Sequence, residues 1–197
     1  LGGDANLVLT DGADVTGAIT SSNATNEGNI TVNGTSVITG AIGVGSGTVR
    51  ILNLVTVAGG AKLSVSGDLH ATDTAVAALG ELVFTHATAA SMNGTLNTST
   101  GNTGTVDLGT ATVTVGGAVA LAGSGSTVKV TIGTTNGKLI ATAGGITWAT
   151  TTKIVPTIAG TITSGTAITI AQGNADPTST LPILGTETYE RYSFTVT

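Results

Sequence analysis

The residues of this sequence best suited to chemistry begin with a small group of carboxylates near its start. Asp4, Asp11 and Asp14 form the only local acid cluster. Hard cations bind several carboxylate and carbonyl oxygens, so the cluster is a candidate calcium site. An Asp beside a Gly is also the ordinary way to close a tight turn, and the glycine-rich nonapeptide of calcium-binding β-rolls is absent. We favour a turn at Asp11, keep calcium as the weaker interpretation, and expect no other metal or cofactor.

The two histidines of the chain, His70 and His86, form the second candidate site. A histidine pair can ligate a metal or act as a general base. Asp68 and Asp73 flank His70, but only threonines flank His86, so neither histidine has the neighbours that would complete such a site. We expect both side chains to be solvated surface residues without a catalytic role.

Motifs of other active sites are missing from the sequence. It has no nucleophile elbow, no phosphate-binding glycine loop that leads into a helix, and no zinc-type spacing. The absence of cysteine excludes disulfides and thiolate metal sites. A glycosidase or lyase on a β-helix needs convergent carboxylates or basic groups on one face, whereas the 11 acids lie mostly one per repeat, in predicted turns. We therefore predict that the protein is not an enzyme and has no catalytic residues.

The elements that must position these residues come from an internal repeat. In each of six copies, apolar residues lie two positions before and two positions after a central glycine. The copies are Val15-Gly17-Ile19, Ile38-Gly40-Ile42, Val65-Gly67-Leu69, Met92-Gly94-Leu96, Val115-Gly117-Val119 and Ile158-Gly160-Ile162. Their glycines are 23, 27, 27, 23 and 43 residues apart. Periods of this length indicate solenoid units that stack on one another.

A pair of apolar residues usually precedes the glycine pattern, so each unit is predicted to be a strand, a short turn and a second strand. The pairs are Leu7 and Leu9, Ile30 and Val32, Val55 and Val57, Leu82 and Phe84, and Val106 and Leu108. Of the 197 residues, 54 are Ser or Thr, 30 are Gly and only 3% are aromatic, which suits strands around thin aliphatic layers. Three short strands in a coil of 23 to 27 residues predict an all-β parallel β-helix, or β-solenoid. The alternative is an antiparallel β-sandwich, as in a filament subunit.

The central glycines have a predicted orientation. Residues i, i+2 and i+4 of a strand share a face, so each glycine should point inward with its two apolar flanks. We expect the six glycines to lie one above another where the coil bends, since a side chain there would collide with the neighbouring coil.

Charge and hydropathy limit the partners of the chain. The net charge is -5 and the six lysines and arginines are scattered singly, so no basic surface is available for nucleic acid. Glycine, threonine and serine interrupt every apolar run before the ~18 residues that a membrane-spanning helix needs. We expect no nucleic-acid partner and no membrane-spanning segment in this chain.

The domain organisation follows the same repeat. Residues 1–147 carry the solenoid repeats, whereas the composition changes in residues 148–197. All three prolines and four of the five aromatic residues lie in this last part. Solenoids need atypical terminal repeats to cover their last layer, so we predict that residues 148–197 form a terminal cap or a junction to another domain.

The repeats also resemble a known family. The segments SVITGAIGVGSGTVRILNL, TVDLGTATVTVGGAV and KIVPTIAGTITSGTAITIAQ, and the closing RYSFTVT, are similar to the passenger regions of bacterial autotransporter surface proteins. The likeness is greatest to the large rickettsial surface antigens, including their surface-layer protein. The resemblance implies a β-helical passenger displayed outside the outer membrane, acting in adhesion or as a protective coat. No catalytic residue carries over from it.

These observations together predict the class of function. We expect an extracellular, non-catalytic structural or adhesive protein of the bacterial cell surface. Open coil ends carry unpaired backbone groups, so we expect it to self-associate into a homo-oligomer, a surface layer or a filament. The alternative is an adhesin module that binds a host-cell receptor or a glycan through outward loops such as residues 21–28. A polysaccharide-active β-helix enzyme is the weakest interpretation.

Overall fold

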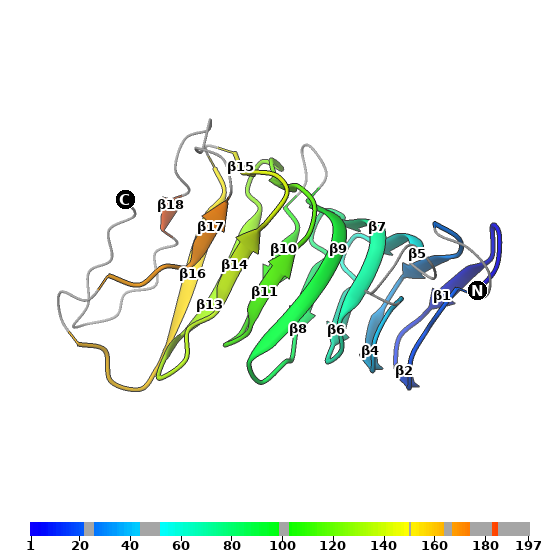
Figure 1. Cartoon of the computed structure of the whole chain (residues 1–197), viewed down its shortest axis with the longest axis horizontal. Coiled ribbons are helices and arrows are strands. Elements are labelled where there is room, and N and C mark those ends of the chain that lie inside the picture. Colours follow the sequence, from blue (N-terminus) through cyan, green and yellow to red (C-terminus); the bar gives the residue numbers. More distant parts are fainter. Residues whose placement is uncertain are drawn as a thin grey trace.

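The computed structural model describes residues 1–21, 26–43, 52–98, 103–149, 151–163 and 167–173, together with the backbone of residues 183 and 184. These residues form an all-β parallel solenoid of about 6 turns, with about 23 residues per turn and no helix among them. Figure 1 shows the turns stacked side by side along the long axis of the molecule. Every described strand pair is parallel. The solenoid prediction is confirmed, and the antiparallel β-sandwich is wrong.

Two sheets run along the solenoid, and successive turns add strands to both. The first sheet contains, in spatial order, β1 (Asn6–Leu9), β3 (Asn29–Val32), β5 (Leu52–Val57), β7 (Leu69–Val76), β9 (Ala89–Asn97), β11 (Thr112–Val115), β14 (Lys138–Ala141) and β17 (Ala171–Gly173). The second contains, in spatial order, β2 (Ala13–Thr16), β4 (Thr35–Thr39), β6 (Lys62–Val65), β8 (Glu81–Phe84), β10 (Thr105–Asp107), β13 (Thr127–Gly133), β16 (Lys153–Ala159) and β18 (Ile183–Leu184). The turn predicted at Asp11 and Gly12 joins β1 to β2.

The third strand predicted for each coil is separate in two of the described turns. There it forms β12 (Val119–Leu121) and β15 (Ile146–Trp148), which pair with each other. β12 also pairs with the last residues of β9, whose first residues pair with β11. In the turn that contains β9, therefore, this single long strand takes the place of the two short strands β11 and β12 of the next turn.

The length of a turn varies more than the repeat predicts. The register gives 23 residues from Asn6 to Asn29, 19 from Lys62 to Glu81 and 32 from Leu139 to Ala171. Most of the additional residues lie in the connections, and among the described pairs the register shifts only where β7 pairs with β9. Turn length is therefore set by the loops and not by the ladder.

The interior is a narrow column of aliphatic side chains. Along the second sheet an inward row runs in register through Leu63, Leu82, Val106 and Val128, and none of these is more than 2% exposed. The residues between them in each strand face outward and are less buried, as strand alternation requires. The thin aliphatic layers predicted from the composition are confirmed.

The glycine repeat changes phase in the middle of the chain. Gly17, Gly40 and Gly67 follow strands of the second sheet and lie in one column, because Gly40 abuts the backbone of Gly17 and Gly67 abuts that of Gly40. Gly94 lies within β9 and Gly117 in the bend between β11 and β12, all in the first sheet, and these two glycines form a separate column. The prediction of one column of six is wrong, because the pattern marks a bend in the chain and the solenoid has bends after both sheets.

The orientation predicted for these glycines is also wrong. Gly17 is exposed, and Gly40 and Gly67 are half-buried, so they do not point into the core as their apolar flanks do. A Cβ on Gly40 would lie 2.5 Å from the carbonyl oxygen of Gly17. The predicted collision with the neighbouring coil is therefore present, but it is directed along the stack of coils.

The boundary between residues 147 and 148 stays a prediction. β16 continues the second sheet by pairing with β13 along its whole length, and β17 continues the first by pairing with β14. Beyond residue 173 the described part of the chain contains only the backbone of β18, which pairs with the start of β16. The ladder thus extends past residue 148 in both sheets.

We predict that two adjacent glycines respond oppositely to alanine. A Cβ on Gly117 would collide with the backbone of Gly94, whereas a Cβ on Gly116 would lie 3.4 Å from its nearest atom, the carbonyl oxygen of Met92. Gly117→Ala should lower the free energy of unfolding by about 1–3 kcal/mol through overpacking. Gly116→Ala, the matched control, should be neutral or stabilising by up to about 1 kcal/mol, because alanine restricts the unfolded chain. Urea unfolding of both variants measures the difference, and equal effects would contradict this role of Gly117.

Candidate functional site

The structure places the three aspartates of the predicted acid cluster in separate roles. Asp11 accepts a hydrogen bond of 2.6 Å at Oδ1 from the backbone N–H of Thr35, one coil further on. Asp4 is exposed in a turn, and Asp14 is exposed on the outward face of β2. Within the described residues no group of three or more His, Asp or Glu side chains could hold a metal ion. Asp11 therefore joins two coils, as its turn position predicts, and nothing described supports the calcium interpretation.

His70 is buried, so its prediction as a solvated surface residue is wrong. Its side chain is 5% exposed. The alternation of β7 fails at this point, because Leu69, His70 and Ala71 are all buried and the pairing with β9 shifts register just beyond His70. Gly43, from the preceding coil, abuts the backbone of His70. A register shift cannot be read from apolar spacing alone, which is why the sequence pattern missed it.

The surroundings of His70 favour the neutral form of its imidazole. Burial lowers the pKa of His70 below its ordinary value of 6.5, although Asp68 and a hydrogen bond with Asn93 partly counteract burial. Nε2 lies 3.9 Å from Oδ2 of Asp68, too far for a hydrogen bond, and Nδ1 is buried without a partner. Oδ1 of Asp68 already accepts the N–H of Ser91 at 2.8 Å. No neighbouring group therefore activates His70 as a general base. Its side chain packs within the coil.

His86 is also less solvated than predicted. It is half-buried just after β8, and its ring centroid lies 6.4 Å from that of Phe84 with the planes tilted by 46°. The Phe84 ring is itself in the core. His86 therefore packs its ring at the margin of the core.

A charged cluster that sequence reasoning missed lies on the outward face of the second sheet. Glu81 contacts Lys62 with Oε2 at 3.1 Å and Lys129 with Oε1 at 2.7 Å. Burial on its own would raise the pKa of Glu81, but the hydrogen bonds from Lys129 and Lys62 outweigh it and hold this pKa below its usual value. A carboxylate held ionised between two ammonium groups suits a tie between coils better than proton transfer. Only the register brings these distant residues together.

A second polar cluster, on the first sheet, also joins neighbouring coils. Asp73 in β7 accepts hydrogen bonds from the amide of Asn97 in β9, at 2.7 Å to Oδ1 and 3.0 Å to Oδ2. The hydroxyl of Thr95 also donates to Asp73. On the same sheet, the side-chain amide of Asn53 in β5 donates to Oδ1 of Asn29 in β3 at 3.0 Å. Outward amides, hydroxyls and carboxylates are thus bonded to each other along the stack.

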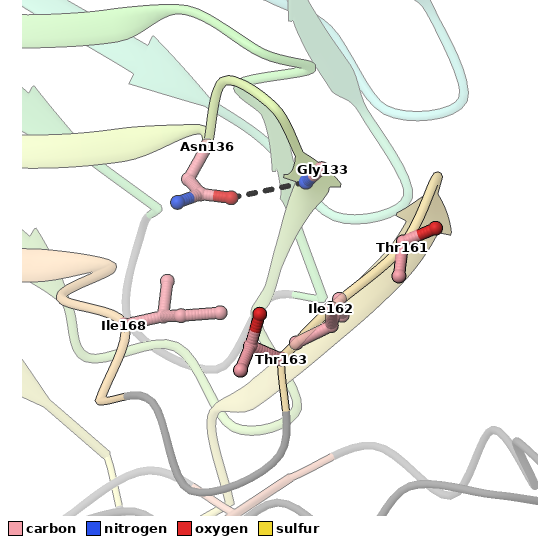
Figure 2. Close-up of a pocket in the computed structure, with 6 residues that line it drawn as sticks. All are labelled: Gly133, Asn136, Thr161, Ile162, Thr163 and Ile168. Atoms are coloured by element: carbon pink, nitrogen blue, oxygen red, sulfur yellow. Dashed lines mark hydrogen bonds between the residues drawn. The ribbon is translucent and has the colours of Figure 1, made fainter.

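One shallow pocket lies near the last described turns. Its lining residues are Gly133, Asn136, Thr161, Ile162, Thr163 and Ile168. Figure 2 shows Asn136 and Ile168 on one side of the space and the segment from Thr161 to Thr163 on the other. Asn136 Oδ1 accepts the N–H of Gly133 at 3.0 Å, which holds the turn after β13. The volume is about 170 Å³, below the ~300–1,000 Å³ of most small-molecule sites.

The pocket has the chemistry of a neutral polar surface. Hydroxyl and amide groups alternate with two half-buried isoleucines, and no acid or base lines it. Such a lining can form hydrogen bonds with a hydroxyl-rich ligand of about one sugar ring, and it provides neither a nucleophile with an adjacent base nor a set of metal ligands.

Fold and surface together define a parallel β-solenoid whose described polar side chains mainly join one coil to the next. The chain matches no protein-family model, no curated protein and no solved structure. None of the described segments forms a helix of the length and apolarity that crossing a membrane requires. The resemblance to autotransporter passengers is thus supported at the level of the solenoid fold and repeat alone.

We predict that His70 makes the protein less stable in mild acid. Its pKa is lower in the folded protein than the ordinary 6.5, so the unfolded chain binds the proton more readily. The free energy of unfolding should then fall progressively as the pH drops below about 6.5 toward the lowered pKa. His70→Gln should show a shallower fall over this range. Urea unfolding at a series of pH values between about 7.5 and 5.5 measures it, and an unchanged pH dependence in His70→Gln would rule out this effect.

Proposed function

We propose that this protein is a non-catalytic structural component of a bacterial cell surface, which acts outside the cell and assembles by end-to-end addition of solenoids. The observation that carries the proposal is the outer side of the first described coil, formed by β1 and β2 in Figure 1, where no described residue pairs with either strand. Its edges and its core are both less covered than those of the coils that follow.

The outer edges of the first described coil carry backbone groups that no described residue pairs with. Within the described chain β1 pairs only with β3, and β2 only with β4. The carbonyls of Ala5 and Leu9 accept the N–H groups of Asn29 and Asn33 in the next coil. Because backbone direction alternates along a strand, Val8 between them directs its N–H and C=O groups to the free edge. Such an edge is a template for another parallel strand.

The core is also open at this end. Leu7, Ala13 and Val15 are only half-buried, whereas their register partners Ile30, Ser36 and Ile38 are 0% exposed. A coil from a second copy would cover these apolar side chains and remove them from water, at about 25 cal/mol for each Å². Head-to-tail contacts of this kind do not close on themselves, so they lead to filaments or layers.

The same structure supports a passive role for the polar groups. Asp11 and Asp73 accept hydrogen bonds from a neighbouring coil, and Glu81 accepts one from Lys129, two coils further on. These bonds use the carboxylates as ties that hold the stack together. We therefore propose no catalytic activity.

We predict that a lysine at the free edge weakens assembly. Val8 is 49% exposed on the edge strand β1, and Val37 is 39% exposed on β4, which has a strand on each side. Val8→Lys should raise the concentration of half-assembly about tenfold, or ~1.4 kcal/mol, because charge on an edge opposes strand addition. Val37→Lys, which adds the same charge, should leave it unchanged.

Sedimentation velocity over a wide range of concentration measures both variants. If Val37→Lys alone blocks assembly, the contact is lateral and not end to end. A wild-type protein that stays strictly monomeric at high concentration would overturn the proposal.

A second candidate function is glycan binding, which the neutral, hydroxyl-lined pocket of Figure 2 favours. In this case the solenoid is an adhesin module for host-cell surfaces. Residues 22–25 of the loop predicted to carry such binding lie outside the described residues. The pocket is therefore the better place to test the idea.

We predict for this candidate that removal of pocket hydroxyls abolishes binding. Thr161→Val with Thr163→Val keeps the shape of both side chains and removes their hydrogen bonds to a sugar. Thr157→Val, on an exposed residue of β16 outside the pocket, is the matched control. Titration with a panel of neutral oligosaccharides, followed by NMR chemical shifts, should show shifts at the pocket that only the double variant loses. The absence of shifts for the whole panel would exclude the candidate.

A further inference from the structure

Three asparagines in this chain are each followed by glycine, a pair with its own chemistry. They are Asn33, Asn93 and Asn136. Glycine has no Cβ, so its backbone nitrogen can approach the side-chain carbonyl carbon of the preceding asparagine. Attack there converts the amide into a cyclic imide. The reaction needs a glycine nitrogen and a side-chain amide that are not held by other groups.

The structure restrains two of the three pairs. Asn93 lies within β9, and its side chain is hydrogen-bonded to His70. Asn136 uses its Oδ1 to accept the N–H of Gly133 at 3.0 Å. The backbone nitrogen of Gly137, the attacking atom in that pair, donates to the carbonyl of Thr131 at 2.9 Å. Both pairs are therefore held away from the geometry of attack.

Asn33 is in the opposite situation. It is exposed in the turn between β3 and β4, and among the described residues none forms a hydrogen bond with its side-chain amide. Gly34 is buried, but its backbone nitrogen, the attacking atom, has no hydrogen bond to a described residue, in contrast to that of Gly137. The sequence alone treats the three pairs as equal, and the fold distinguishes them.

We propose that Asn33 is a site of spontaneous deamidation in the folded protein. The backbone nitrogen of Gly34 forms a bond to Cγ of Asn33, and the Cγ–Nδ2 bond breaks. The proton of the Gly34 N–H goes to the departing group, which leaves as ammonia. Water then opens the imide at either of its two carbonyl carbons. One opening gives aspartate, and the other gives isoaspartate, in which the side-chain methylene becomes part of the main chain.

The product changes a junction between the first coils. The carbonyl of Gly34 accepts the N–H of Lys62 at 3.2 Å, and the next residue, Thr35, donates its N–H to Asp11. Gly34 itself has no room to move towards the first coil, because a Cβ on it would lie 2.5 Å from the backbone nitrogen of Asp11. An extra main-chain atom and a new carboxylate beside Asp11 therefore weaken both ties. This consequence holds whether or not the protein self-associates.

The test uses incubation of the folded protein at neutral to mildly alkaline pH, then trypsin digestion and mass spectrometry. Cleavage after Arg50, Lys62, Lys129 and Lys138 puts the three pairs in different peptides, residues 1–50, 63–129 and 130–138. The side-chain amide of Asn33 should be converted to a carboxyl, with the corresponding increase in peptide mass, several times faster than that of Asn93 or Asn136. Fragment spectra assign the change to residue 33, and Asn33→Gln should remove it.

Two further results decide the matter. In concentrated denaturant the three sites should react at similar rates, since the fold no longer restrains any of them. If Asn33 keeps its amide while the unfolded protein reacts, or if all three sites react equally in the folded protein, the proposal is overturned.

Discussion

The close approach of one backbone to the next is the constraint on which the rest of this structure depends. Parallel strands lie only about 4.8 Å apart along the hydrogen-bond direction, and every coil must repeat that spacing on both sheets. Where a strand ends and the chain bends, the neighbouring backbone is nearest, and Gly67 and Gly117 stand there without room for a Cβ. The glycine pattern of the sequence arises from this close contact between backbones. It marks where two coils meet and not which sheet they belong to.

The same spacing determines where polar groups are buried. Chain bends leave carbonyl groups outside the ladder, and buried hydroxyls at the bends bond to them. Thr152 donates to the carbonyl of Leu121 at 2.7 Å, and Ser126 donates to that of Gly123 at 3.0 Å. The hydroxyls of Thr98 and Ser126 also lie 2.7 Å apart in neighbouring coils. These hydroxyls therefore take the place of ladder bonds at the bends, in agreement with the need to pair buried polar groups. The buried hydroxyl of Thr74, within β7, is an exception without a partner.

Sequence reasoning could reach the fold because alternation and period are local properties. The apolar pairs, the turn at Asp11 and the outward small residues all follow from spacing along one strand. What it missed depends on neighbours that lie one turn away. The pair Leu82 and Phe84 looks like Leu7 and Leu9, but β8 belongs to the second sheet and β1 to the first. The 19-residue turn from Lys62 to Glu81 caused that change of phase. The ion pairs of Glu81 could not be predicted either, because the length of each turn determines which residues lie beside Glu81.

A filled, narrow solenoid also limits where function can be located. The interior of the described coils is closed by aliphatic side chains, so it provides no deep cavity in which water could be excluded around reacting groups. The outward carboxylates Asp73 and Glu81 are already bonded to residues of other coils, and using them for a ligand would cost those bonds. Among the described residues, β1 and β2 each pair with a strand on one side only, and the groups left without a partner there are backbone groups. A backbone edge recognises another strand and not a particular small molecule. The physical character of this fold therefore favours assembly over catalysis.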